Sequence, residues 1–266
     1  VDWKRNELFV LDYKPHVKVY DLSGNYKRTL PVPIKVRDRE MYPYSDSHLV
    51  LFKEVPDTEI GQADKDFAPY QPIILLEKTT GETTTLPYTK TSNASIRLSS
   101  GWVNNNAIYA SGRNIYLSDV SSDTIYQLHP SGHTIEPKIV RTPSVNSMDG
   151  ERFLLNLEGS SNRYGFFRRT NKEIKGKAAQ SMQEWMYDYQ TGKTFQPIFK
   201  NQDAPSMKLD AHTLIHCHGE DNCLYVKLEA FEVIEALENG ELNGELQTIA
   251  QELVEDDNPV LMIVKL

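Results

Sequence analysis

The sequence predicts an all-β fold, a β-propeller of about five to six four-stranded blades with a short helical insertion before its closing strand. Three observations predict it. A hairpin with a glycine turn recurs, further strand-like runs accompany each hairpin, and the chain ends in two helical stripes followed by an apolar strand. The chain has 266 residues, a size that one closed all-β domain commonly reaches, so we expect residues 1–266 to form a single domain.

The recurring hairpin consists of a strand, a short turn with glycine, and a strand rich in Thr, Tyr or Ile. It occurs as YDLSGNYKRTL (20–30), LEKTTGETTTL (76–86), YQLHPSGHTIEP (126–137) and YDYQTGKTFQPI (187–198). By subtraction of their residue numbers, successive turn glycines are 57, 51 and 60 residues apart; they are Gly24, Gly81, Gly132 and Gly192. Glycine suits such turns because it adopts positive φ without a Cβ clash.

Other strand-like runs lie between the hairpins, namely HLVLFKE (48–54), AIYASGRNIYLSD (107–119), RFLLNLEG (152–159), YGFFRRT (164–170) and AHTLIHCH (211–218), which opens a fifth unit. Each unit therefore holds about four short strands, the content of a propeller blade. Propeller arrays repeat every ~40 to 50 residues, so the spacing here requires insertions such as the polar segment 55–71. A β-sandwich or an irregular barrel also contains such hairpins, but the near-constant spacing favours a propeller.

The segment from about 228 to 254 departs from the strand pattern. Apolar residues recur there at helical spacing, first at Leu228, Phe231, Ile234 and Leu237, then at Leu242, Leu246, Ile249, Ala250 and Leu253. Pro259 ends the second stripe because proline biases the preceding residue away from α geometry. The ending PVLMIVKL (259–266) has the composition of a strand. We expect the helices to pack on the propeller, and the last strand to close the ring by completing a blade near the N-terminus.

Composition excludes several partners. The chain has 29 basic and 37 acidic residues and a net charge of −8, so nucleic acid and anionic membrane surfaces are not expected partners. The basic cluster from Arg168 to Lys177 fits a solvated surface loop. No run of 18 apolar residues occurs, so we expect no transmembrane segment.

Two stretches carry a resemblance to a known family, the turn motif VYDLSGNYKRTL (19–30) and the ending ENGELNGEL…EDDNPVLMIVKL (238–266). They resemble six-bladed β-propeller proteins found as predicted secreted lipoproteins in gut commensal bacteria, which are related in pattern to NHL-repeat propellers. Members are typically longer and carry a lipobox cysteine, whereas this chain shows about five units and no lipobox. The resemblance implies a fold and a cell-envelope location, periplasmic or anchored to the outer membrane, but no catalytic residues.

Both cysteines and three histidines fall within HTLIHCHGEDNC (212–223). On a strand, His216 and His218 share one face and Cys217 points to the other, while His212 lies ~13 Å from His216, so we expect no metal site. The turn-like segment between Cys217 and Cys223 allows an antiparallel return that brings their Cα atoms within the ~4.4 to 6.8 Å of a disulfide. An oxidising envelope favours that bond. Two free thiols are the alternative.

A candidate binding face contains Trp102, which follows SSG and precedes NNNA, a polar setting for a large ring. Arg97 and Arg113 are its candidate partners, because aromatic platforms with a few polar groups suit sugars and peptides. Packing between blades is the alternative role for Trp102, as it is for Trp185 and Tyr187.

A catalytic site would instead require two carboxylates ~5 to 10 Å apart across the central pocket, as in propeller glycosidases. The candidates lie near the starts of the units' strands; they are Asp46, Asp149, Glu151 and Asp210. Acidic residues in turns usually satisfy backbone donors, which is the simpler explanation for Asp21, Asp119 and Asp123.

The sequence contains no glycine-rich phosphate loop and no G-x-S-x-G elbow, so it predicts neither nucleotide binding nor that class of hydrolase, and it implies no cofactor. We expect an envelope propeller that binds a glycan, a peptide or an envelope protein without catalysis. The alternatives are a glycan-cleaving hydrolase with paired carboxylates in the central pocket, and a structural interaction module of a larger envelope assembly. The oligomeric state does not follow from the sequence.

Overall fold

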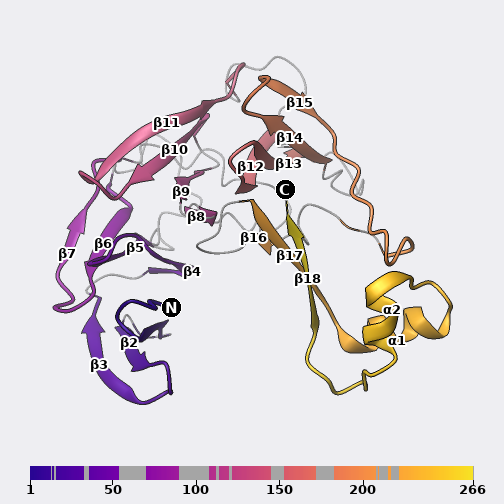
Figure 1. Ribbon diagram of the computed structural model, residues 1–266. Coiled ribbons are helices and arrows are strands. Elements are labelled where there is room, and N and C mark those ends of the chain that lie inside the picture. The colour runs from indigo at the N-terminus through magenta and orange to yellow at the C-terminus, as the bar shows by residue number, and fades with distance from the viewer. Residues whose placement is uncertain are drawn as a thin grey trace. The chain divides into compact units, whose positions relative to one another are not determined.

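The computed structural model describes residues 1–12, 14, 16–32, 36–53, 70–89, 108–111, 114–119, 122–144, 153–171, 183–207, 209, 215–216 and 222–265 (Figure 1). These residues form an all-β fold with two short helices. The chain divides into two compact units. The first comprises residues 1–109, 114–154 and 172–177, and the second comprises residues 110–113, 155–171 and 178–266.

Five sheets follow one another along the chain, and within each sheet neighbouring strands are consecutive in sequence. Sheet one contains β1 (Glu7–Leu11), β2 (His16–Asp21) and β3 (Tyr26–Pro31); sheet two contains β4 (Val36–Pro43), β5 (His48–Lys53), β6 (Ile73–Glu77) and β7 (Thr83–Thr85). Sheet three contains β8 (Ile108–Ser111), β9 (Asn114–Leu117), β10 (Thr124–His129) and β11 (Thr134–Val140). Sheet four contains β12 (Phe153–Ser160), β13 (Tyr164–Asn171), β14 (Gln183–Asp188) and β15 (Lys193–Phe195). Sheet five contains β16 (Ile215–His216), β17 (Cys223–Leu228) and β18 (Val260–Lys265).

The predicted hairpins are present. Their four turn glycines all have positive φ: 87° at Gly24, 78° at Gly81, 94° at Gly132 and 68° at Gly192. At Gly81 a Cβ atom would also lie 2.9 Å from the side chain of Pro31, so this glycine permits a close approach of sheet one as well as the turn.

An acidic side chain opens three of these turns. The Asp21 carboxylate accepts hydrogen bonds from the backbone N–H groups of Ser23 and Asn25. Glu77 and Asp188 accept equivalent bonds in their own turns, from residues 79–80 and 190–191. The expectation that Asp21 satisfies backbone donors is confirmed, and the repeat is therefore a repeat of turn chemistry as well as of strand length.

Alternating apolar side chains build a separate core in each unit. In the first unit, Val19, Leu51 and Leu76 belong to a cluster that joins β1–β3 to β4–β6. In the second unit, Phe166 and Leu224 belong to a cluster that joins sheets four and five to the helices. β5 and β6 each bury four consecutive residues, 49–52 and 73–76, so both faces of sheet two are covered along these strands.

The C-terminal segment folds as α1 (Ala230–Glu238), α2 (Gly244–Ala250) and then β18. The helices pack on the second unit's core, as expected, with Val233, Ala236, Leu246 and Ala250 buried in it. Two residues of the predicted stripes instead face solvent: Phe231 is 54% exposed and Ile249 is 38% exposed. Figure 1 shows α1 and α2 side by side in the connection between β17 and β18. No helix in the described part of the chain is long and apolar enough to cross a membrane.

The expected partner of the last strand is wrong. β18 pairs antiparallel with β17, from Cys223 opposite Lys265 to Leu228 opposite Val260, and not with a strand near the N-terminus. The physical reason is the short helical connection: α1 and α2 carry the chain out from the end of β17 and return it alongside the same strand, so the loop that must be closed is short. Closure of the five sheets into a ring and the single-domain organisation stay predictions.

Candidate functional site

Sheets two and three have two unlike ends, because every second connection in an antiparallel meander lies at the same end. At one end the strands are joined by residues 54–72, 86–107 and 118–123, and residues 141–152 follow β11; we call it the loop end. At the other end the strands are joined by residues 44–47, 78–82, 112–113 and 130–133; we call it the turn end. Binding residues concentrate on long connections, which makes the loop end the first candidate.

Three tyrosines, Tyr70, Tyr88 and Tyr126, form a tyrosine cluster at the loop end. The rings of Tyr88 and Tyr126 meet edge to face, with centroids 5.5 Å apart and an angle of 63° between their planes. Tyr70 contributes to the electrostatic surroundings of Tyr88 and carries the Lys53 ammonium 5.5 Å from its ring centroid. All three tyrosines are half-buried, so their rings are held in place while part of each remains accessible.

Local backbone structure positions these rings. Tyr126 lies on β10 opposite Leu117 of β9, and Tyr88 follows the buried Leu86, whose N–H donates to the Ile73 carbonyl. Tyr88, in the connection that follows β7, thereby places its ring against Tyr126 near the start of β10. Two sheets therefore contribute to one cluster.

Asp119, two residues after the end of β9, adds a negative charge beside the cluster. The residue is 4% exposed, and its carboxylate interacts electrostatically with the Tyr88 hydroxyl. Burial, followed by the negative charge of Asp119, raises the pKa of Tyr88 above its ordinary value, and a hydrogen bond with Ser122 opposes this shift. The Tyr88 hydroxyl consequently stays protonated at any physiological pH and can both donate and accept a hydrogen bond.

A second polar group lies on the same connections. The Ser144 hydroxyl donates to the Asp123 carboxylate at 2.6 Å, and Arg141 pairs with Asp123 at 3.8 Å. The Arg141 guanidinium also lies 4.5 Å from the ring centroid of Phe153. The loop end thus combines aromatic faces, two carboxylates and a guanidinium, the mixture with which proteins bind polar ligands that have flat apolar faces.

The structure brings together residues that the sequence did not single out for binding. Trp102, Arg97 and Arg113, the predicted binding residues, lie outside the described residues and stay predictions. The expectation that Asp119 and Asp123 satisfy backbone donors in turns stays a prediction; Asp119 lies near Tyr88, and Asp123 contacts Arg141 and Ser144. The signal that could have identified the two acids as candidates is their position, because both lie in the connection between β9 and β10 at the loop end of sheet three.

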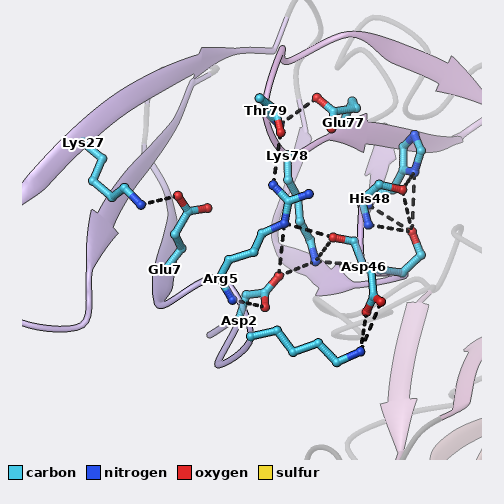
Figure 2. A network of polar contacts seen from close by, with 12 residues as sticks. Asp2, Arg5, Glu7, Lys27, Asp46, His48, Glu77, Lys78 and Thr79 are labelled. Carbon is cyan, nitrogen blue, oxygen red and sulfur yellow. Dashed lines mark hydrogen bonds and ion pairs between the residues drawn. The ribbon is translucent and has the colours of Figure 1, made fainter.

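The turn end carries a different arrangement, a polar junction centred on Lys78 (Figure 2). Lys78 is 2% exposed, and its ammonium donates to the Asp2 carboxylate and to the Ser45 carbonyl, each at 2.7 Å. Arg5 donates to the Asp46 carbonyl at 3.1 Å and to the Thr79 hydroxyl at 3.1 Å. The junction ties the segment before β1 to two turns of sheet two, so its role is structural.

Glu7 is the second buried charge of this junction and is 4% exposed. Its carboxylate accepts two hydrogen bonds from Arg28, at 2.6 and 2.9 Å, and one from Lys27 at 2.6 Å. The bonds from Arg28, with those from Lys27, outweigh burial and lower the pKa of Glu7 from 4.5 to about 2. Arg28 also donates to the Lys78 carbonyl at 2.7 Å, which links the two buried charges.

We expect Glu7 to make the fold acid-sensitive. Because its pKa is lower in the folded chain than in the unfolded chain, its contribution is complete above pH 4.5 and is lost as the pH falls toward 2. Between pH 6 and pH 3 the wild type should lose about 2 kcal/mol of unfolding free energy more than Glu7→Gln does. Urea unfolding at both pH values measures this difference. The exposed Glu82→Gln is the control, and equal losses in wild type and Glu7→Gln would contradict the assignment.

One of the four candidate catalytic carboxylates lies in the described part of the chain. Asp46 is at the turn end, its side chain is 83% exposed, and it pairs with the Lys4 ammonium at 2.9 Å. This exposed ion pair on a turn gives Asp46 none of the burial that a catalytic acid needs. Asp149, Glu151 and Asp210 lie outside the described residues.

Cys223 is disulfide-bonded. Its predicted partner, Cys217, lies outside the described residues, as do His212 and His218, so the Cys217–Cys223 pairing and the question of a metal ion at the histidines stay predictions. Within the described ranges no three or more His, Cys, Asp or Glu side chains gather as a metal ion requires.

Comparisons with known proteins give a likeness in fold alone. No protein-family model matches the chain, and no curated protein matches it. Nineteen chains of solved structures do match. One is a protein of Bacteroides fragilis NCTC 9343 described as a candidate exported protein; it is 14% identical with a TM-score of 0.60, over 100% of this chain and 75% of that one. Another is the tricorn protease, 11% identical with a TM-score of 0.43 over 84% of this chain and 18% of that one, a likeness too weak to carry an argument.

Proposed function

We propose that this chain is a non-catalytic module that binds a glycan at the loop end of sheets two and three. The observation that carries the proposal is the tyrosine cluster with Asp119 at its side. Sugar rings present flat C–H faces that stack on aromatic rings, and their hydroxyl groups donate to carboxylates. Tyr88 and Tyr126 supply the rings, and Asp123, whose side chain is 22% exposed, supplies an acceptor at the same end of sheet three.

The proposed scaffold is a β-propeller in which the five sheets are blades. Three contacts between consecutive sheets support this arrangement: sheet one packs on sheet two, Tyr44 and Tyr88 of the sheet-two connections contact sheet three, and sheet four packs on sheet five. We also propose that the protein works in the cell envelope, as the family resemblance implies. The similarity in fold to a candidate exported protein and the disulfide at Cys223 agree with an oxidising, extracytoplasmic location.

The proposal predicts that Tyr126→Ala weakens glycan binding about tenfold, since one aromatic contact contributes ~1.5 kcal/mol. A glycan array first identifies a ligand of the wild-type chain, and isothermal titration calorimetry then compares the variants. Tyr88→Phe, which removes only the hydroxyl, should cost less than Tyr126→Ala. Tyr26→Ala is the matched control, because Tyr26 is 59% exposed at the start of β3 in sheet one, outside the loop end.

Three other outcomes would each reject a part of the proposal. Equal affinities of Tyr126→Ala and Tyr26→Ala would show that the glycan binds elsewhere. Binding of peptides with no glycan bound would reject the ligand class. Release of a shortened glycan would favour the hydrolase alternative, with Asp119 and Asp123 as the carboxylates to substitute first, because they share one short connection.

A further inference from the structure

Two histidines meet at the turn end of the first unit, where sheets two and three touch. His48 begins β5, and His133 lies in the turn between β10 and β11 with φ of 52°. Their rings are edge to face, with centroids 5.5 Å apart. The ring of Tyr44 stacks on the other side of His133 at 5.7 Å, with 21° between the planes. The three rings join the β4–β5 turn to the β10–β11 turn, and we call them the histidine contact. Tyr44 and His129, which the same contact links, are 85 residues apart in the chain.

Tyr44 fixes this contact in place. It is 4% exposed, and its hydroxyl donates to the His129 carbonyl at 2.9 Å, so one side chain binds both ends of the β10–β11 turn. Burial raises the pKa of Tyr44 to about 12, which keeps that hydroxyl a donor. On the sheet-two side, the Ser47 hydroxyl lies 2.8 Å from Nδ1 of His48.

The surroundings of His48 disfavour protonation of its ring. Burial, and after it the neighbouring His133, lower the pKa of His48; Lys78 acts in the same direction, and Glu77 acts against it. His129, on the strand that leads to the turn, faces Glu136 at 3.4 Å. A positive charge on the His133 ring, 5.5 Å from the His48 ring, therefore disfavours a charge on His48.

We propose that His48 and His133 form a pH-sensitive contact between sheets two and three, which is closed while at most one ring is charged and opens when both are. This is a regulatory property of the scaffold and does not depend on glycan binding. Two positive rings 5.5 Å apart repel, and the release of His133 removes the stacking partner of Tyr44. Since the pKa of His48 is lower in the folded chain than in the unfolded one, the contact is complete above pH 6.5 and weakens as the pH falls below it.

Histidine NMR titration of the full chain between pH 8 and pH 5 tests the proposal. His133→Gln should raise the titration midpoint of His48, because it removes the neighbouring ring whose charge lowers the pKa of His48. The nuclear Overhauser contact between the rings of Tyr44 and residue 133 should weaken at pH 5 in the wild type and persist in His48→Gln. His16→Gln is the control, since His16 is exposed at the start of β2.

A His48 midpoint that is the same in wild type, His133→Gln and His16→Gln would overturn the proposal. A Tyr44 contact that survives unchanged to pH 5 in the wild type would also overturn it. If a histidine variant does not fold, the wild type decides by itself, because a Tyr44–His133 contact that is unchanged between pH 8 and pH 5 excludes the proposed opening.

Discussion

Leu246→Asp is expected to lower the free energy of unfolding by about 4 kcal/mol or more. Leu246 lies on α2, is 6% exposed and belongs to the core that joins the helices to sheets four and five. Aspartate at this position loses the apolar contacts of the leucine and places a charge where water does not reach it. Urea unfolding at pH 7 measures the change, and the slope with denaturant should stay similar if the same core still unfolds as one unit.

Ile249→Asp is the matched control for this prediction. Ile249 is on the same short helix but is 38% exposed, so its replacement removes little buried surface and leaves the new carboxylate in water. We expect a cost below ~1 kcal/mol for the control. A cost below ~1 kcal/mol at Leu246 as well would show that α2 is detachable from the second unit, and the packing of the helices would then contribute little to its stability.

The sequence predicted this region well because its signals are local. The apolar spacing in 228–254 is set by residues three and four apart, and both helices lie inside that range. The hairpin turns were predictable for the same reason, since Gly24 and Asp21 act within one turn. The partner of β18 was not predictable in this way, because pairing depends on where the chain returns after the helices and not on the composition of PVLMIVKL.

The candidate site shows the same division between local and distant signals. Tyr88 and Tyr126 are 38 residues apart by subtraction, and no spacing rule connects them before sheets two and three are placed side by side. Lys78 lies in the polar turn KTTGE, which is typical of a solvated hairpin, yet it is buried. Its burial depends on Asp2, 76 residues away, so only the fold could reveal it.

That burial leads to the second large prediction, that Asp2→Ala lowers the free energy of unfolding by about 3 kcal/mol. The ammonium of Lys78 would keep its bond to the Ser45 carbonyl but lose its carboxylate partner at 2.7 Å, and an uncompensated charge in a buried site is strongly destabilising. Burial alone would raise the pKa of Asp2, yet its hydrogen bond with Lys78 and further contacts with Lys78 and Arg5 lower it, which shows that the pair is compensated. Thermal and urea unfolding at pH 7 measure the loss.

The exposed pair between Lys4 and Asp46, which lies in the same junction, separates this explanation from a general effect of charge (Figure 2). Its side chains are 77% and 83% exposed, so Lys4→Ala should cost far less than Asp2→Ala although the N–O distance, 2.9 Å, is nearly the same as in the buried pair. The double variant Asp2→Ala with Lys78→Met should recover part of the loss, because it removes the buried charge together with its partner. If the single and double variants were equally unstable, the cost would come from lost packing at the start of β1, and the charge of Lys78 would not be its cause.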